Sequence, residues 1–288
     1  MKGCIGIRKE NKDFTEQRAP LTPDQVHKLI QKDGLRILVE LAENRIFKDD
    51  EYVKSGAVLS KNLKECNIVL GVKEIPISSL LPGQNYFFFS HTIKGQAYNM
   101  PMLKSFLDLR NTLIDYELVT DREEKRLIFF GKFAGYAGMI DSLWALGLRL
   151  GWEGIETSFS SIRQALHYHN LEEAKSSIQQ AGKVIEKRGL PPQLVPLICG
   201  FAGYGHVSQG AQEVFDVLPH EGIQAGELSD FMQKKQFSDK KLYKVVFSES
   251  DMVQPRDKST TFHLQDYYDN PEKYESIFKS YLPHLTVL

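Results

Sequence analysis

The sequence predicts an α/β protein with two domains, each built on a parallel sheet covered by helices. Short apolar segments of strand length alternate with helix-like segments through the first half of the chain, which is the pattern of a parallel sheet. A second strand–turn–helix pattern follows at 193–219. The 288 residues exceed one average domain, and we place the two domains at 1–130 and 131–288.

The elements of the first domain follow from local signals in chain order. The first helix begins at its N-cap, Thr22, with Pro23 at the first helical position, and ends at Gly34. A short helix begins at residue 48 and is closed by Gly56. The domain is completed by strands at 3–7, 35–40, 67–72, 85–90 and 111–116 and by a helix at 96–110.

In the second domain, residues 125–152 predict a strand, a glycine-rich turn and a long apolar helix, and residues 158–189 predict an amphipathic helix. Strand segments recur at 241–250 and at 283–288, where the chain ends. A parallel strand normally leads into a crossover that returns to the sheet. We therefore expect the second sheet to be incomplete and the chain to be truncated at its C-terminal end.

Composition restricts the class of protein. With 42% apolar and 25% charged residues and a net charge of −1, the chain predicts a soluble globular protein that binds neither nucleic acid nor a membrane. No signal-peptide pattern is present, so we expect a cytoplasmic protein, or a mitochondrial-matrix one if a transit peptide was removed. Cys4, Cys66 and Cys199 lie in apolar segments and predict buried thiols. His167 and His169 do not share a helical face, so no metal site is predicted.

A glycine turn at 203–208 joins a predicted strand to a predicted helix. Free N–H groups at such a helix start can bind a pyrophosphate, so the turn predicts a Rossmann-like dinucleotide site; a tight turn without a ligand is the alternative. Ser208 stands at the usual third glycine and is small enough for close packing. Glu249 follows the next predicted strand and would hold the adenosine ribose, which favours NAD over NADP; residues 220–240 are interpreted as an insertion. The candidate cofactor-binding residues are Gly203, Gly205, His206, Val207, Ser208 and Glu249.

Two predicted strands of the first domain end in groups that can carry a proton. The segment at 67–72 leads into Lys73 and Glu74, and the segment at 85–90 leads into His91. A parallel sheet presents its carboxyl ends to the ligand crevice. A histidine, or a lysine beside apolar strands, can exchange protons near neutral pH. Ordinary loop residues are the alternative that the pattern alone leaves open.

Six longer segments are distinctive in their order: EQRAPLTP (16–23), NIVLGVKEIP (67–76), FFFSHTIKGQAYNMPML (87–103), LIDYELVTD (113–121), GKFAGYAGMID (131–141) and GYGHVSQGAQEVF (203–215). Together they resemble the lysine–ketoglutarate reductase domain, the saccharopine-forming half of the aminoadipic semialdehyde synthases. The broader family includes saccharopine dehydrogenases and, more distantly, alanine dehydrogenase and transhydrogenase N-terminal domains. The resemblance implies two Rossmann-like domains, an alanine dehydrogenase/transhydrogenase N-terminal-like substrate and catalytic domain followed by a partial dinucleotide-binding domain.

The resemblance also implies a reaction. L-Lysine condenses through its ε-amine with the keto group of 2-oxoglutarate, and NADPH or NADH reduces the imine to saccharopine, or the reverse reaction takes place. The acid–base pair of the family carries over to Lys73 and His91. Lys132 stands where saccharopine dehydrogenases carry arginine. The substrate-binding residues that the resemblance implies are Arg18, Glu74, Lys94, Glu117 and Lys132.

Alternatives stay open for both residues and function. A surface ion pair with Glu16 is the alternative for Arg18, and anchoring of a strand end is the alternative for Glu117. A truncated, non-catalytic relative that binds a ligand or a partner is the alternative function. An alanine-dehydrogenase-type enzyme is a third and less favoured hypothesis. The oligomeric state and the physiological direction are left open.

Overall fold

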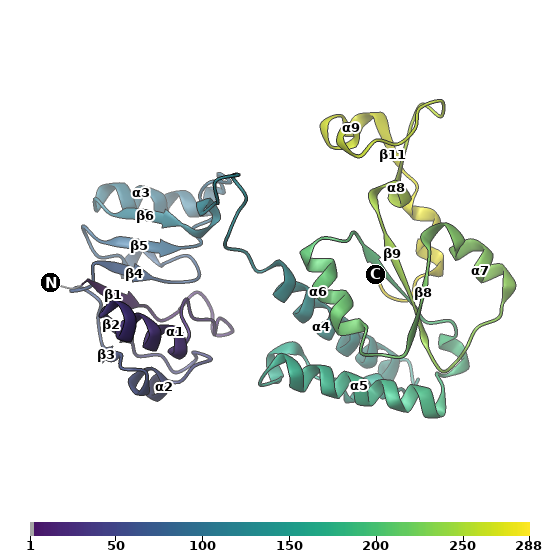
Figure 1. Ribbon diagram of the computed structural model, residues 1–288, viewed down its shortest axis with the longest axis horizontal. Helices are drawn as coiled ribbons and strands as arrows, with labels where there is room; N and C mark the ends of the chain where they lie inside the picture. Colours follow the sequence, from purple (N-terminus) through teal and green to yellow (C-terminus); the bar gives the residue numbers. More distant parts are fainter. Residues whose placement is uncertain (1–2) are drawn as a thin grey trace. The chain divides into compact units, whose positions relative to one another are not determined.

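The computed structural model describes residues 3–288, which divide into two compact units. The first unit ends at Phe129 and the second begins at Phe130. Each unit contains a parallel sheet with helices, as Figure 1 shows, so the predicted α/β class is confirmed. Among the described residues, no helix combines the length and the apolar character needed to cross a membrane.

The first unit is built on a six-stranded, all-parallel sheet in the order β3-β2-β1-β4-β5-β6. The strands are β1 (Cys4–Ile7), β2 (Arg36–Glu40), β3 (Val58–Ser60), β4 (Ile68–Leu70), β5 (Asn85–Phe88) and β6 (Thr112–Asp115). The chain builds outward from β1 to β3 and then returns to β4 on the other side of β1, so the strand order reverses between β1 and β4. Strand β3 was not predicted, because three residues are too few to give an alternating pattern.

Local signals set the helices of the first unit, which are α1 (Pro23–Lys28), α2 (Asp49–Lys54) and α3 (Met100–Asp108). Thr22 caps α1 through a capping box with Gln25, as the sequence predicts. A π turn then extends the helix to Gly34, whose φ of 61° is left-handed and suits glycine. On α3, the ring of Phe106 packs edge-on against Tyr86 of β5, with the ring centroids 5.4 Å apart. This aromatic contact fixes α3 on the sheet.

The second unit has a three-stranded parallel sheet in the order β7-β9-β8. The strands are β7 (Ile198–Ala202), β8 (His220–Ile223) and β9 (Leu242–Phe247). The helices that accompany them are α4 (Gly131–Trp152), α5 (Leu171–Arg188), α6 (His206–Phe215) and α7 (Leu228–Lys234). A smaller lobe follows β9 and is yellow-green to yellow in Figure 1. It consists of α8 (Glu249–Met252), β10 (Val253–Pro255), α9 (Leu264–Asp269) and β11 (Tyr274–Ser276), with β10 and β11 antiparallel.

The strand and the glycine-rich turn predicted within 125–152 are wrong. Arg126 forms only an isolated bridge with Thr120, and the glycines of this segment lie inside one continuous helix, α4. A Cβ atom at Gly135 would fall 1.9 Å from the carbonyl oxygen of Val207 on α6. Glycine is therefore used here for close packing of two helices, not for a turn.

Two further segments differ from the prediction. Residues 158–170 contain short 3-10 turns, so α5 begins only after Asn170, whose side chain accepts the N–H of Glu173 at 2.9 Å. Residues 220–240, interpreted as an insertion, contain β8 and α7, and β8 pairs with β9 of the sheet. The strand predicted at 283–288 is reduced to a short parallel pairing, in which the carbonyl of Val287 accepts the N–H of Gly200 at 2.8 Å.

Candidate active site

The ends of β4 and β5 bring two proton-carrying side chains to one edge of the first sheet. The strands are neighbours, and their pairing continues past β5, because the N–H of Phe89 donates to the carbonyl of Val72 at 3.1 Å. Lys73 and His91 follow immediately, and both are half-buried. The structure thus places the two residues at the carboxyl edge of the sheet, where α/β proteins bind ligands.

His91 lies between two carboxylates. Its Nδ1 is 3.3 Å from Oε2 of Glu117, and its Nε2 is 4.0 Å from Oε1 of Glu74. The backbone φ of His91 is 53°, a left-handed conformation that is uncommon for residues other than glycine, although histidine adopts it more often than most. The ring stacks at 16° on that of Phe89. A strained backbone held at a strand end is typical of functional sites.

Glu117 is the centre of a small ion-pair cluster. Its Oε1 lies 3.0 Å from Nζ of Lys94 and 3.3 Å from Nη1 of Arg126, and its side chain is 7% exposed. Burial alone would raise the pKa of this carboxyl, but the hydrogen bond and charge of Lys94, together with His91, hold the pKa below its usual value. Glu117 is therefore ionised at neutral pH and both of its oxygens have cationic or polar partners.

Glu74 is paired in a similar way on the other side of His91. Its Oε2 accepts a hydrogen bond from Nζ of Lys12 at 2.8 Å. Burial opposes ionisation of Glu74, but the hydrogen bond and charge of Lys12, a backbone hydrogen bond and the charge of His91 together lower the pKa of Glu74. The hydrogen bond to Glu74 also raises the pKa of Lys12. The sequence did not single out Lys12 or Arg126, because both reach the site from loops and carry no spacing signal.

Arg18 is engaged with a neighbour in the chain. Its guanidinium forms a fork on Glu16, with Nε 2.8 Å from Oε1 and Nη2 2.5 Å from Oε2. Burial would raise the pKa of Glu16, but the fork from Arg18 and the charge of nearby Lys73 lower it. The ion pair considered from the sequence is therefore present. The Arg18 side chain is still 47% exposed, so its role in binding a substrate carboxylate stays a proposal.

Lys132 belongs to a different cluster, on α4 and α6 of the second unit. Its Nζ is 2.8 Å from Oε2 of Glu213, whose other oxygen is 2.6 Å from Nζ of Lys175. The hydroxyl of Tyr136 also donates to Glu213 at 2.9 Å. Hydrogen bonds from Lys132, Lys175 and Tyr136 lower the pKa of Glu213 to about 2. The structure does not bring Lys132 together with the acid–base residues within one unit.

The glycine turn of the second unit has the form predicted from the sequence. Gly203 has a left-handed φ of 92° and donates its N–H to the carbonyl of Phe247 at 2.8 Å, and Gly205 begins α6 without a side-chain cap. A Cβ atom at either glycine would meet no heavy atom within 4 Å, so the turn is open to an approaching group. His206, Val207 and Ser208 form the first turn of α6, and the backbone N–H groups of a first helical turn can face an anion. The residues present therefore fit a phosphate group.

Close helix packing beside the turn involves Gly210. A Cβ atom at Gly210 would fall 2.1 Å from the carbonyl oxygen of Lys132 on α4. This glycine lies two residues beyond Ser208 on α6 and faces a helix, which a pattern derived from turn geometry does not reveal. That Ser208 is small enough for close packing stays a prediction.

Glu249 lies where the adenosine ribose would be expected in a Rossmann-like domain. It begins α8 directly after β9, and β9 pairs with β7, the strand that leads into the glycine turn. The sheet order explains the long spacing in the sequence, because β8 and α7 intervene in the chain but β8 lies on the far side of β9. Oε1 of Glu249 accepts a hydrogen bond from the hydroxyl of Tyr268 at 2.7 Å, which lowers the pKa of the carboxyl.

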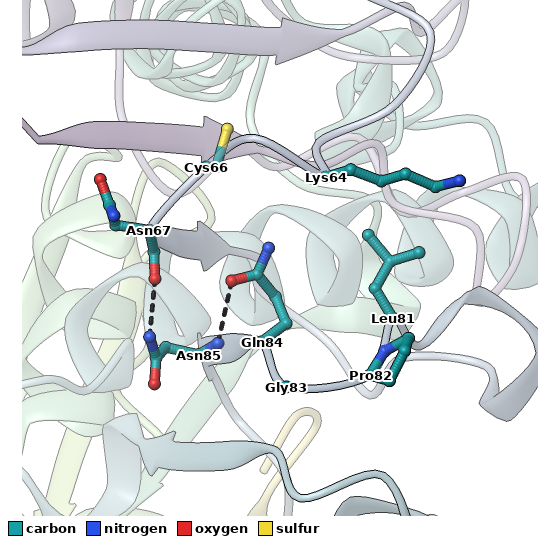
Figure 2. A pocket seen from close by; sticks show the side chains of 8 residues that line it. All are labelled: Lys64, Cys66, Asn67, Leu81, Pro82, Gly83, Gln84 and Asn85. Atoms are coloured by element: carbon teal, nitrogen blue, oxygen red, sulfur yellow. Dashed lines mark hydrogen bonds between the residues drawn. The ribbon is translucent and has the colours of Figure 1, made fainter.

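A cavity of about 570 Å³ lies at the opposite, amino edge of the first sheet. Two hydrogen bonds join residues that line it, as Figure 2 shows: Nδ2 of Asn85 donates to the carbonyl of Asn67 at 2.7 Å, and the N–H of Asn85 donates to Oε1 of Gln84. This cavity contains none of the acid–base residues. Within residues 3–288, no cluster of three or more His, Cys, Asp or Glu side chains is arranged to hold a metal ion.

Fold and site together define the class of the first unit: an α/β domain with a parallel sheet whose carboxyl edge gathers a lysine, a histidine and paired carboxylates. Residues 6–137 match the family "Alanine dehydrogenase/PNT, N-terminal domain". The match covers nearly all of the first unit, and the resemblance inferred from the motifs is confirmed.

Two synthases match over nearly the whole chain, and a saccharopine dehydrogenase matches over half of it. The alpha-aminoadipic semialdehyde synthase of Arabidopsis thaliana is 38% identical over 301 residues, 99% of this chain and 28% of that protein. The mitochondrial alpha-aminoadipic semialdehyde synthase of Bos taurus is 37% identical over 288 residues, 100% of this chain and 31% of that protein. The NAD(+), L-lysine-forming saccharopine dehydrogenase of Candida glabrata is 36% identical over 154 residues, 51% of this chain and 40% of that protein. The chain thus spans less than a third of the length of the two synthases.

Among solved structures, a transhydrogenase from Sinorhizobium meliloti aligns with a TM-score of 0.49 at 15% identity, over 85% of this chain and 62% of that one.

Proposed function

We propose that this chain carries the saccharopine-forming activity of an NAD(P)-dependent oxidoreductase that acts on a CH–NH bond. In this reaction L-lysine and 2-oxoglutarate condense, lose water and are reduced to saccharopine, or saccharopine is oxidised in reverse. The observation that carries the proposal is the placement of Lys73 and His91 after adjacent parallel strands, with Glu74 and Glu117 beside the imidazole. Imine formation and reduction need two such proton-transfer groups.

The surroundings of the two residues support distinct proposed roles. With Nδ1 of His91 directed to Glu117 at 3.3 Å, its Nε2 is left to exchange a proton with the carbinolamine oxygen as water departs. Lys73 would take the proton released when the substrate ε-amine attacks the keto carbon, and would return it in the reverse reaction. Glu74 and Glu117 keep the imidazole oriented, and their cationic partners Lys12 and Lys94 balance their charge.

Exposed cations beside this pair would bind the substrate carboxylates. Lys94 is 56% exposed and Arg18 is 47% exposed, and each is paired with a carboxylate on one side. An incoming carboxylate can share the guanidinium fork of Arg18 or take a free N–H of the Lys94 ammonium. Lys132 remains a proposed substrate residue of the second unit, where it would first have to leave Glu213.

The second unit would bind the dinucleotide. A bound nicotinamide supplies the hydride for reduction of the imine. Gly203 and Gly205 leave space for a pyrophosphate, the N–H groups at the start of α6 would hold it, and Glu249 would accept a hydrogen bond from the ribose 2′-hydroxyl. A carboxylate there repels a 2′-phosphate, so we propose NAD in preference to NADP.

The direct test mixes the purified chain with L-lysine, 2-oxoglutarate and NADH or NADPH, and follows the absorbance of the reduced nicotinamide. Oxidation that requires both organic substrates is expected. A parallel reaction with pyruvate and ammonia tests the alanine-dehydrogenase alternative, and turnover there instead would redirect the proposal. No oxidation in either mixture, from a chain shown to be folded, would leave the non-catalytic alternative in its place.

A further inference from the structure

A buried carboxylate holds the backbone from which Lys73 projects. Glu10 follows β1, and its side chain is 2% exposed. Its Oε1 accepts the N–H of Val72 at 2.9 Å and its Oε2 accepts the N–H of Lys73 at 3.0 Å. Both carboxylate oxygens are thus directed to two consecutive residues at the end of β4.

Charged and polar groups surround the buried Glu10 carboxylate. Burial raises the pKa of Glu10 above its usual value, although the charge of Arg8 and the backbone N–H groups of Val72 and Lys73 oppose this shift. Arg8 is itself 6% exposed, with Nη1 3.3 Å from Oε1 of Glu10. A Cβ atom at Gly71 would fall 2.9 Å from Cδ of Arg8, so a glycine at this position leaves room for the pair. A buried ion pair of this kind costs desolvation and is weak evidence for a stabilising role alone.

A second buried carboxylate, that of Asp115, holds the backbone beside His91. Asp115, at the end of β6, is 6% exposed. Its Oδ1 accepts the N–H of Glu117 at 2.8 Å, and its Oδ2 accepts both the N–H of Ser90 at 3.2 Å and the Ser90 hydroxyl. Asn99 donates to the carbonyl of Ser90 at 3.0 Å. The backbone before His91 and the backbone of its carboxylate partner are therefore fixed by one side chain.

We infer that Glu10 and Asp115 are positioning residues for the acid–base pair, an inference that rests on the proposed function. Glu10 sets the backbone that carries Lys73, and Asp115 sets the distance between His91 and Glu117. Neither carboxylate has a free oxygen to offer a substrate. Their effect is geometric, because a displacement of about 1 Å in a reacting group can cost up to about a hundredfold in rate.

The test uses isosteric amides, Glu10→Gln and Asp115→Asn. Each replaces one accepting oxygen by an NH2 group that faces a backbone N–H, so one hydrogen bond is lost. The turnover number per folded molecule is expected to fall at least about tenfold. The KM for the nucleotide should be unchanged, because both substitutions lie in the first unit and the proposed nucleotide site lies in the second. A purely structural role would lower the folded fraction and leave the turnover of folded molecules intact.

The matched control is Glu40→Gln. Glu40 ends β2 and accepts a backbone N–H, that of Lys9 at 3.0 Å, but holds neither catalytic candidate. Its turnover should equal that of the wild type. If Glu10→Gln fails to fold because Arg8 is left without its partner, Arg8→Met combined with Glu10→Gln removes the orphaned charge. Wild-type turnover per folded molecule in both the Glu10 and the Asp115 variants would overturn the inference.

An activity-free readout separates this inference from the proposed function. If the wild type shows no turnover, the proposed function fails by itself. Amide hydrogen exchange at Val72 and Lys73 then decides about Glu10. Faster exchange there in Glu10→Gln, but not in Glu40→Gln, supports the positioning role, and unchanged exchange refutes it.

Discussion

The close packing of α4 on α6 gives a prediction that can be worked through from distances. A Cβ atom at Gly135 would lie 1.9 Å from the carbonyl oxygen of Val207 and 2.7 Å from the backbone nitrogen of Ala211, whereas ordinary contact begins at 3.4 Å. The helices would have to part by about 1.5 Å, because backbone atoms cannot rotate away as side chains do. Gly138, one turn along the same helix, has no heavy atom within 4 Å of such a Cβ.

Alanine substitutions at Gly135 and Gly138 should therefore have opposite effects on the stability of the second unit. Gly138→Ala gains about 1 kcal/mol of helix propensity without a clash. Gly135→Ala gains the same propensity but pays an overpacking cost of about 3 kcal/mol, for a net loss of about 2 kcal/mol in the free energy of unfolding. At about 2–4 °C per kcal/mol, the melting temperature of the second unit should fall by about 6 °C in Gly135→Ala and rise by about 3 °C in Gly138→Ala.

Tryptophan fluorescence during thermal unfolding is the assay. The chain has two tryptophans, Trp144 and Trp152, and both lie on α4, so the signal reports the second unit alone. Trp144 packs against the core of this unit, while Trp152 is 90% exposed. Equal melting temperatures for Gly135→Ala and Gly138→Ala would refute the close approach of α4 and α6. Because α6 carries the glycine turn, the Gly135 variant should also bind nucleotide more weakly.

Three further predictions concern the site. His91→Ala and Lys73→Met should each lower turnover at least about tenfold while substrate still binds; unchanged steady-state turnover in both would remove their acid–base assignment. NADH should outperform NADPH in kcat/KM, and Glu249→Ala should narrow that difference; a preference for NADPH that is insensitive to the substitution would contradict the ribose role. The pKa of Glu74 is lower in the folded state than its value of about 4.5 in the unfolded chain. The stability that Glu74 contributes is therefore present above about pH 4.5 and is lost as the pH falls through the folded-state pKa. Lys12→Met should thus destabilise the first unit at pH 7 and have little effect well below about pH 4. Circular dichroism of wild type and variant across pH checks this, and an equal loss at both pH values would contradict the ion-pair explanation.

Much of the fold could be predicted from the sequence because its signals are local. The capping box at Thr22 and the left-handed glycines at 34 and 56 each depend on neighbours within a few residues. The glycines of α4 misled the prediction, because a glycine that allows a turn and a glycine that allows two helices to touch look alike in one dimension. Only the backbone of α6, about seventy residues further along the chain, distinguishes the two uses.

For the site as well, part could be predicted from local sequence and part depended on tertiary contacts. The sequence by itself determined that Lys73 and His91 end strands, since apolar segments and their polar successors are adjacent in the chain. The tertiary structure decided that β4 and β5 are neighbours, that Lys12 pairs with Glu74, and that Glu10 and Asp115 accept the backbone N–H groups beside the pair. The bonds to Lys73 and Ser90 join residues 63 and 25 positions apart, and no local pattern encodes them; the bond from the N–H of Glu117 to Asp115 spans only two positions and is local. The physical reason is that the hydrogen-bond partners of a buried carboxylate are the groups that surround it after folding. The order of the strands in the sheet decides which groups these are.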